Sequence, residues 1–432
     1  MFKVAYFANQ FPSAVEPYVG EEIRELNRLQ VPVIPGSVRR PIPIARQSGD
    51  LPDPEILCLQ PLRAWTLLQA IGLAFRSLRR ISGLLRRVIF GGHETPLCRF
   101  KALLHTWLGA YYALRLQNRG VEHIHVHHGY FASWIAMVAA RLLGIGYSVT
   151  LHGSDLLLHG NYLNTKLGNC KFCVTISEYN RAYILQHFPE VDPAKIVVSR
   201  LGVDLPEPQS LRTKANTTRD FTLLAVGRLH PVKDHAFLIK ACAKLRDRGL
   251  DFGCVFAGEG PERLRLEELI RKNQLQNHIT MLGHVPREEM DAHYRRADVV
   301  VLTSRSEGIP LVLMEAMARG RLVLAPAITG IPELVIAGKT GFLYMPGVVE
   351  DFVARILFLH ETLFREKYRA VNRLDWIRHA ARVQVTHNFN REKNLHHFSH
   401  QFLRRIADRD TEDKDRSVAS EDPVLQQIQL SL

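Results

Sequence analysis

The chain has 432 residues, of which 46% are hydrophobic and 23% are charged. This length exceeds the roughly 250–300 residues beyond which a single hydrophobic core splits, so this ordinary globular composition predicts two domains. Lysine and arginine number 56 against 43 acidic residues, a formal net charge of +13. Nucleic acid could attract such an excess, but no helix-turn-helix, zinc finger or RNA-binding aromatic motif accompanies it. We therefore expect no nucleic-acid partner.

The first elements in the chain alternate between strands and helices. Residues 2–8 are mostly apolar and predict a buried strand, a proline-containing loop follows over 9–19, and residues 20–29 predict a helix. The same alternation returns in the strand, helix and strand predicted at 121–127, 132–143 and 147–151. Such βα units are typical of a doubly wound parallel sheet. We expect the first domain to span residues 1–205.

Residues 62–92 combine apolar side chains with arginines and contain no acidic residue. The arginines interrupt the segment too often for a transmembrane span, which needs about 20 predominantly apolar residues. One interpretation is a basic amphipathic helix on an anionic membrane surface. The other is a helix that packs its apolar stripe on the sheet and leaves its arginines in solvent. Both interpretations remain open and are compatible with each other.

Histidines alternate along the predicted strand 121–127, so that His123, His125 and His127 share one face. Such a cluster could bind a metal, but the intervening Ile124 and Val126 favour an ordinary strand whose end enters the interdomain cleft. Cys170 and Cys173 form a lone C-x-x-C motif, whereas a structural zinc site needs a second pair or suitably spaced histidines. We expect two thiols at the end of a strand and no metal site.

The number of cysteines and the first residues of the chain indicate the cellular compartment. Only six cysteines are present, and no apolar segment with a small-residue cleavage site follows Met1. We expect a cytoplasmic protein, which residues 62–92 could place at the inner face of the plasma membrane.

A second βα series follows a break in the pattern. Residues 206–220 are polar, contain two prolines and lack apolar periodicity, which predicts a linker. The strands and helices of the next domain, residues 221–385, then alternate as in the first. Helical segments continue to residue 407, and the charged, polar residues 408–432 predict a disordered tail.

The turn between the predicted strand 298–302 and the predicted helix 311–319 offers an anion site. Free N–H groups of Ile309, Leu311 and Val312 can point at a phosphate, and the helix dipole adds attraction. Pro310 suits the first helical turn because it lacks an N–H group. Glu307 stands before this turn and Glu315 about two turns into the helix. Since carboxylates accept hydrogen bonds from sugar hydroxyls, the arrangement favours a nucleotide sugar.

The spacing of Glu307 and Glu315 resembles the E-x7-E signature of the retaining glycosyltransferases of family four. Other segments match the family in the expected order, at 225–234, 256–261, 282–286, 329–335 and 338–342. The resemblance is dense over 221–343 and looser in the first half of the chain. It implies an α/β protein with two Rossmann-like doubly wound parallel-sheet domains that face each other across a cleft, the GT-B fold. It also implies that the helix 386–407 returns to the first domain.

The resemblance assigns roles to particular residues. Arg228 and Lys233 would neutralise the donor diphosphate without a metal ion, Glu307 would bind the transferred sugar, and His152 would contact the donor sugar or the acceptor. Donor binding would further involve Gly227, Gly283, His284, Val285, Gly308, Ile309, Pro310, Leu311 and Glu315. The loop 9–20 resembles that of exopolysaccharide-type members, with Glu16 at the matching acidic position, and His127 resembles a second family position in the segment 125–129. Glu16 and His127 are therefore candidate acceptor contacts.

We therefore expect transfer of a hexose from a UDP- or GDP-sugar to a saccharide or lipid-linked saccharide, with retention of configuration. No cofactor is expected, and exopolysaccharide or cell-envelope glycan synthesis is the expected setting. Two alternatives remain open. One is a nucleotide-sugar epimerase or phosphorylase on a GT-B fold, and the other is a non-catalytic, membrane-associated nucleotide-binding scaffold.

Overall fold

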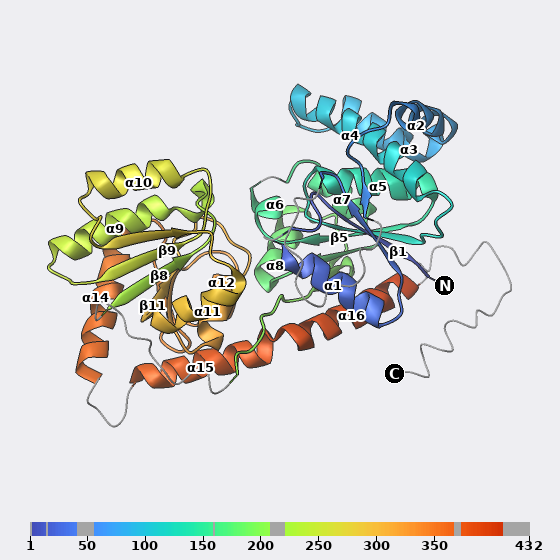
Figure 1. The fold of residues 1–432 in the computed structure, drawn as a ribbon. Helices are drawn as coiled ribbons and strands as arrows, with labels where there is room; N and C mark the ends of the chain where they lie inside the picture. The colour runs from blue at the N-terminus through green and yellow to red at the C-terminus, as the bar shows by residue number, and fades with distance from the viewer. Residues whose placement is uncertain are drawn as a thin grey trace.

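The computed structural model describes residues 2–13, 16–40, 56–158, 160–207, 221–366 and 373–408. Two parallel sheets form two α/β domains that lie side by side (Figure 1). The expected fold class is thereby confirmed. Most of the expected linker, residues 208–220, and residues 409–432 of the expected tail lie outside the described residues.

The first domain is built on a seven-stranded parallel sheet in the order β3-β2-β1-β4-β5-β6-β7. Its strands are β1 (Val4–Ala8), β2 (Val33–Ser37), β3 (Leu57–Cys58), β4 (His123–His127), β5 (Gly146–Leu151), β6 (Phe172–Thr175) and β7 (Ile196–Val198). The helices are α1 (Pro17–Arg28), α2 (Ala64–Arg76), α3 (Leu78–Phe90), α4 (Pro96–Leu116), α5 (Phe131–Leu143), α6 (Ser154–Leu157), α7 (Leu163–Asn169) and α8 (Glu178–His187), followed by the 3-10 turn η1 (Pro193–Lys195).

Alternate residues of β1 face opposite sides of this sheet, as strand geometry requires. Ala5 and Phe7 pack toward α4 and α5, in the same core as Tyr112. Val4 and Tyr6 pack toward α1 and α16 (Arg391–Ala407) on the other side. Both faces are therefore buried, which explains why the strand residues form a nearly continuous apolar run.

The arginine-rich segment 62–92 forms two helices, where one was expected. Helix α2 ends at Arg76 and α3 begins at Leu78, with Ser77 as the residue between them. Residues Ile81, Leu84 and Val88 of α3 are buried in the core of the first domain, whereas many other apolar side chains of the segment are exposed. The segment thus has a buried apolar stripe and an exposed face, and contact of that face with a membrane remains a prediction.

The second domain has a six-stranded parallel sheet in the order β10-β9-β8-β11-β12-β13. Its strands are β8 (Thr222–Val226), β9 (Gly253–Ala257), β10 (Ile279–Gly283), β11 (Val299–Val301), β12 (Leu322–Pro326) and β13 (Phe342–Tyr344). The remaining elements are η3 (Pro231–Lys233), α9 (His235–Asp247), α10 (Arg263–Lys272), α11 (Arg287–Arg296), α12 (Leu311–Ala318), α13 (Ile331–Leu334), α14 (Val349–Glu366) and α15 (Arg373–Asn388).

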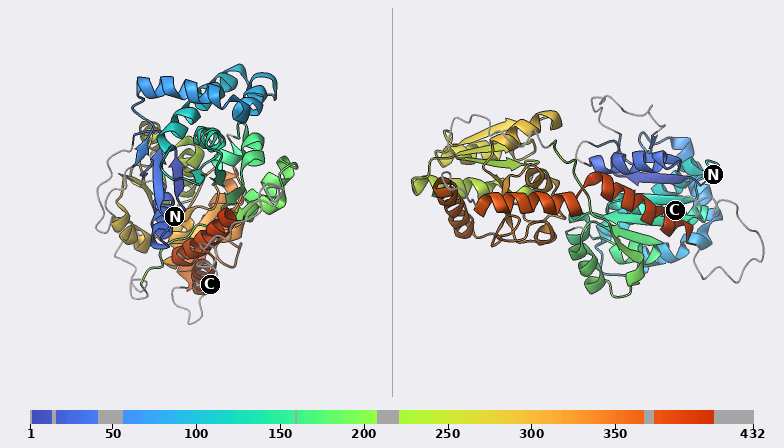
Figure 2. Two further views of the ribbon diagram at one scale, coloured as in Figure 1. Left: turned by 90° about the vertical axis from the view of Figure 1, so that its right-hand side faces the viewer. Right: turned by 90° about the horizontal axis from the view of Figure 1, so that it is seen from below.

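The end of the chain connects the two domains. Helix α15 packs with α12 in a core of the second domain, and α16 packs along α1 of the first (Figures 1 and 2). Between these helices, Phe389 accepts a hydrogen bond from the backbone of Val203, and Arg391 returns one to it. The chain therefore changes domain at residues 389–391, a few residues after the start of the expected returning helix.

Phe402 is the centre of the contact between α16 and the first sheet. Its side chain is 1% exposed and its ring lies against those of Tyr6, His123, His125 and Phe172. We predict that Phe402→Ala lowers the free energy of unfolding by about 3–5 kcal/mol, because it leaves a cavity among these rings. Denaturant unfolding measures the change. Phe364→Ala is the matched control, since Phe364 is 70% exposed on α14, and equal losses for both variants would contradict the role of α16.

Candidate functional site

The charged groups of the second domain lie where its strands end. Arg228 follows β8 directly and is exposed, and Lys233 closes the short turn η3. The Thr303 hydroxyl donates a 2.9 Å hydrogen bond to the carbonyl oxygen of Lys233, which ties this turn to the end of β11. Ligands of open α/β sheets bind at this edge. The structure therefore places both cations where a ligand is expected.

Lys233 and Glu307 form an ion pair. Lys233 Nζ lies 2.5 Å from Glu307 Oε1, and both side chains are mostly buried. The Thr329 hydroxyl donates a 2.6 Å hydrogen bond to the carbonyl oxygen of Glu307 and holds the turn. The sequence assigned these two residues to a phosphate and a sugar separately; the structure adds that each neutralises the other.

Helix α12 begins beside this pair. Pro310 is the N-cap residue and Leu311 the first helical residue, so the N–H groups of Leu311 and Val312 have no acceptor within the helix. Further along, Glu315 Oε2 accepts a 2.6 Å hydrogen bond from Tyr294. This bond holds the Glu315 carboxylate in place, and sequence analysis did not identify Tyr294.

The two domains touch at glycines. A Cβ atom on Gly308 would lie 2.2 Å from the carbonyl oxygen of His152, and one on Gly153 would lie 2.9 Å from the amide nitrogen of Gly308. Both positions therefore exclude a side chain in this arrangement. A cavity between the domains is lined by Tyr18, Glu22 and Thr150 of the first domain and by Leu311 of the second. His152 is thus brought to the start of α12.

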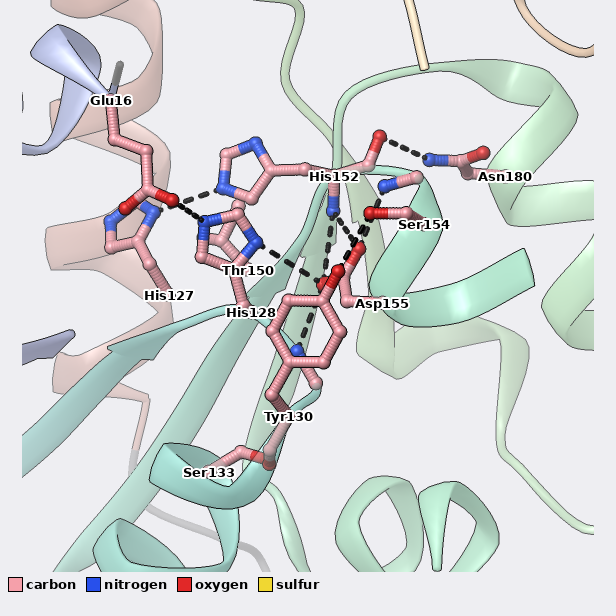
Figure 3. A network of polar contacts seen from close by, with 12 residues as sticks. Glu16, His127, His128, Tyr130, Ser133, Thr150, His152, Ser154, Asp155 and Asn180 are labelled. Carbon is pink, nitrogen blue, oxygen red and sulfur yellow. Dashed lines mark hydrogen bonds and ion pairs between the residues drawn. The ribbon is translucent and has the colours of Figure 1, made fainter. Parts of the chain in front are cut away.

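A charged network fills the first domain's side of this contact (Figure 3). His128 Nε2 lies 3.1 Å from Glu16 Oε1, and His128 Nδ1 lies 3.7 Å from Asp155 Oδ2. Burial acts to lower the pKa of His128, but the hydrogen bonds and charges of Asp155 and Glu16 outweigh it and raise the pKa to about 10. His128 is therefore a cation near neutral pH.

Asp155 organises the turn that carries His152. Its carboxylate accepts hydrogen bonds from the backbone N–H groups of Gly129, His152 and Gly153. Burial acts to raise the pKa of Asp155, but His128 and these N–H groups hold it well below its usual range. His128 adopts a left-handed backbone conformation, with φ of 71°, which is unfavourable for a bulky residue. The ion pairs with both carboxylates stabilise His128 in this strained position.

Arg228 faces this network across the interface. Burial acts to raise the pKa of Glu16, but its hydrogen bond to His128, with smaller contributions from His127 and Arg228, lowers it overall. The charge of Arg228 is therefore felt by a carboxylate of the other domain. Glu16 and Arg228, which the sequence assigned to acceptor and donor respectively, belong to one electrostatic environment.

His127 lies behind His152. It is 0% exposed, and its Nδ1 and Nε2 atoms each lie 3.1 Å from a partner, His152 Nε2 and Glu22 Oε2 respectively. Burial, followed by the charge of His128, lowers the pKa of His152 well below its ordinary value. The expected acceptor contact of His127 remains a prediction, and the structure places His127 in a supporting position.

The histidines of β4 have hydrogen-bond partners. Glu22, His125 and His127 place possible ligand atoms within 4.8 Å of one another. The ring nitrogens of His125, however, lie 2.7 and 2.9 Å from the hydroxyl oxygens of Ser148 and Thr150. Both ring nitrogens of His125 therefore have hydrogen-bond partners, and the absence of a metal site remains a prediction.

The C-x-x-C cysteines are buried free thiols. Cys170 follows α7 and Cys173 lies within β6. Burial raises the pKa of Cys170 to about 12 and that of Cys173 well above its usual range. Both therefore remain protonated near neutral pH, unlike the thiolates that bind zinc.

Further ion pairs hold the domains together, and sequence analysis missed them. Glu333 of α13 accepts hydrogen bonds from the N–H groups of Glu178 and Tyr179, which begin α8, and pairs with Arg200. Arg391 lies 2.9 Å from Glu21, a residue of α1. These contacts join positions at least 133 residues apart, so no local pattern in the sequence indicates them.

The remaining predicted donor residues lie nearby on the second domain. Gly227 joins β8 to Arg228, and Gly283 ends β10. His284 is exposed and Val285 is half-buried against the core beside α12. Ile309 is buried in this same core.

The His128 network makes stability depend on pH. A histidine whose folded-state pKa is about 10 stabilises the fold fully below its unfolded pKa of about 6.5, and this contribution is lost as pH rises toward 10. We predict that the stability difference between the wild type and His128→Gln shrinks over that interval. Unfolding at a series of pH values measures it. His379→Gln, at an exposed histidine of α15, should show no such trend, and a constant difference for His128→Gln would contradict the charged state.

Comparisons with known proteins agree with this geometry. Residues 208–373 match the family of glycosyl transferases group 1, and residues 67–207 match glycosyltransferase family 4. Together these adjoining matches cover most of the chain. They meet at the boundary between the two sheets.

Three individual proteins illustrate the similarity. A protein of Escherichia coli (strain K12) named as a colanic acid biosynthesis glycosyltransferase, WcaL, is 35% identical over 204 residues, 46% of this chain and 48% of its own. The amylovoran biosynthesis glycosyltransferase AmsK of Erwinia amylovora is 32% identical over 173 residues, 39% of this chain and 42% of its own. The aligned segments thus span less than half of each relative.

The solved structure of HepE from Anabaena in complex with UDP and glucose has a TM-score of 0.63 with 17% identity, over 93% of this chain and 99% of HepE. At this identity the likeness shows the fold alone. With the two family matches, it leads to one conclusion: the chain belongs to the family 4, group 1 glycosyltransferases and has their two-domain GT-B fold.

Proposed function

We propose that this protein transfers a hexose from a UDP- or GDP-sugar to a saccharide or lipid-linked saccharide with retention of configuration. One observation carries the proposal. Arg228, the Lys233–Glu307 pair and the first turn of α12 converge at one sheet edge, and the Gly153–Gly308 contact brings His152 to the same place. Cations and free N–H groups suit a diphosphate, and carboxylates suit sugar hydroxyls.

Arg228 and Lys233 are proposed to neutralise the diphosphate. Arg228 offers a planar fork of donors and Lys233 a single charge. In the complex, the diphosphate would compete with Glu307 for Lys233 and free the carboxylate for the hydroxyls of the sugar. These two cations supply the charge stabilisation that a metal ion provides in other transferases, so we propose that no metal is required.

Retention of configuration is proposed from the resemblance to the retaining glycosyltransferases of family four. Because Glu307 is assigned to hydroxyl binding, attack on the same face as departure is the proposed route. The bond from the anomeric carbon to the phosphate oxygen breaks as the bond to the acceptor oxygen forms. The acceptor proton passes to the departing phosphate. Arg228 and Lys233 stabilise the charge that develops on this leaving group.

The setting is proposed from relatives. WcaL and AmsK are named for colanic acid and amylovoran biosynthesis, which supports a role in exopolysaccharide or envelope-glycan synthesis. HepE was solved with UDP and glucose, which makes a uridine nucleotide sugar the first donor to test.

A thermal-shift and nucleotide-release screen against UDP-, GDP- and ADP-sugars, with and without EDTA, tests the proposal. A rise in Tm with one nucleotide, unchanged by EDTA and accompanied by slow release of the free nucleotide, is the expected result. No response to any nucleotide would contradict the donor site. An EDTA-sensitive response would contradict the metal-free mechanism.

The cations can be tested individually. We predict that Arg228→Ala or Lys233→Ala lowers kcat by at least about hundredfold while Tm changes little, because each removes charge stabilisation from the leaving phosphate. Lys240→Ala is the matched control, since Lys240 is an exposed lysine of α9. Near-wild-type turnover for both site variants would refute the assignment.

We also propose that the helical layer α2–α4 contacts an anionic membrane surface. Apolar side chains project from it into solvent, among them Trp65, Phe75 and Phe90, which are 71%, 72% and 80% exposed. Exposed Arg63, Arg76, Arg79, Arg86 and Lys101 accompany them, and anionic lipid headgroups complement this charge. None of the helices in the described ranges combines the length and apolar character needed to cross a bilayer. Surface contact would bring a lipid-linked acceptor close to the protein.

Vesicle cosedimentation tests this surface. We predict that the triple variant Trp65→Ser, Phe75→Ser, Phe90→Ser loses about tenfold or more in binding to phosphatidylglycerol vesicles, because three large apolar groups no longer enter the interface. The control is the double variant Phe364→Ser, Trp376→Ser, whose aromatic side chains are exposed on the second domain. Equal binding by the wild type, the triple variant and the double variant would exclude this surface. Equal binding of the wild type to neutral and to phosphatidylglycerol vesicles would also exclude it.

A further inference from the structure

A chain of hydrogen-bonding groups leads from the interior of the first domain to His152. The buried Tyr6 hydroxyl donates to Glu22 Oε2, and His127 Nε2 lies 3.1 Å from the same oxygen. His127 Nδ1 lies 3.1 Å from His152 Nε2 (Figure 3). Among the described residues, His152 Nδ1 has no hydrogen-bond partner, although it is buried. The chain of contacts therefore ends on an unused ring nitrogen.

The direction of the protons follows from the chemistry of each group. A carboxylate only accepts, so His127 Nε2 must carry a proton that it donates to Glu22. When His127 carries only this one proton, its Nδ1 accepts, and His152 Nε2 donates to it. The remaining nitrogen, His152 Nδ1, then carries a lone pair and no proton. Through its hydrogen bond with His127, Glu22 thus determines which ring nitrogen of His152 carries the proton.

The surroundings support a neutral His152 with a fixed ring. Burial and the charge of His128 both oppose a second proton on His152, since they lower its pKa. Burial, followed by the charge of Glu22, raises the pKa of Tyr6 well above its usual value, so that Tyr6 keeps the proton it donates. Tyr18 stacks on the His152 ring at 4.5 Å between centroids. The His152 carbonyl oxygen accepts a hydrogen bond from the Asn180 side chain.

We propose that Glu22 and His127 are positioning residues, which hold His152 in the tautomer whose Nδ1 accepts a hydrogen bond from a hydroxyl of the bound sugar or acceptor. This inference rests on the proposed function for the identity of the hydroxyl. It gives the last residue of β4 and the residue that follows it distinct tasks: His127 orients its neighbour, and His128 carries a positive charge.

Glu22→Gln should reverse the donor and acceptor roles along this chain of hydrogen bonds. Tyr6 and His127 both contact the Oε2 position of residue 22, so the roles reverse when the glutamine places its NH2 group there and donates one hydrogen to His127 Nε2 and the other to the Tyr6 hydroxyl oxygen. His127 must then donate from Nδ1, His152 Nε2 must accept, and the proton of His152 moves to Nδ1. A hydroxyl would meet a donor in place of an acceptor, so we expect kcat/KM to fall by about tenfold to hundredfold. Glu25→Gln on the same helix is the matched control, since Glu25 pairs with Arg28 outside this chain.

The test is a nitrogen-15 spectrum of the histidine side chains in the full-length, EDTA-treated protein, with the His152 signals assigned by their loss in His152→Gln. The expected wild-type pattern is a bare Nδ1 and a protonated Nε2, which Glu22→Gln exchanges and Glu25→Gln preserves. A protonated Nδ1 in the wild type overturns the inference without the need for any variant. A change of the His127 and His152 signals on addition of zinc would indicate a metal site and would also overturn the inference.

The spectrum is recorded without substrate, so it separates this inference from the proposed function. The expected tautomer together with a loss of kcat/KM in Glu22→Gln supports the inference. The expected tautomer with unchanged kcat/KM in that variant overturns the positioning role. Failure of the nucleotide screen counts against sugar transfer alone, because it does not alter the tautomer.

Discussion

The contact between Gly153 and Gly308 is the constraint on which the site depends. Each sheet presents its functional groups at the carboxyl ends of its own strands, and neither domain holds a complete set. The two turns meet so closely that a Cβ atom on either glycine would overlap backbone of the other domain. Only this approach brings the histidines of the first domain to the cations and the helix start of the second. The ion pairs of Glu333 and Glu21 stabilise the same arrangement from either side.

Charged side chains in the site are paired with side chains of opposite charge. Lys233 is held by Glu307, and His128 is held between Glu16 and Asp155. Each pair is largely buried, and an isolated charge would be costly in such a buried position. A ligand with phosphates and hydroxyls can exchange partners with such pairs without leaving a bare charge. The charges of the site are therefore balanced by neighbouring side chains, and the site is polar enough to recognise a nucleotide sugar in the proposed reaction.

The two sides of the first sheet have different tasks. On one side, α1 and α16 cover β1 and β4, so that the end of the chain supports the strand that carries the histidines. On the other side, α4 and α5 separate the sheet from the exposed apolar and basic face of α2 and α3. A contact made by this outer face would leave the interdomain site accessible, since the two lie on different parts of the domain (Figure 1).

Local patterns in the sequence were sufficient for the fold class and for much of the donor side. Apolar runs and the turn after each one predicted β8, β11 and α12, because a parallel strand buried on both faces needs such a run. Arg228, Lys233, Glu307 and Glu315 follow these strands or lie on the next helix, so their common edge could be inferred from topology. The break at Ser77 was missed because the apolar pattern continues across it.

Tertiary structure alone decided how these groups pair. Lys233 with Glu307, Glu22 with His127 and Tyr6, and Glu333 with the start of α8 each join residues from distant segments. A single sequence carries no signal for such pairs, because their contact depends on how separate elements pack. The sequence by itself determined which elements form and which chemical groups stand at their ends. The packing of elements within and between the two domains decided which group neutralises, donates to or orients another, since hydrogen bonds and ion pairs act only over a few ångströms.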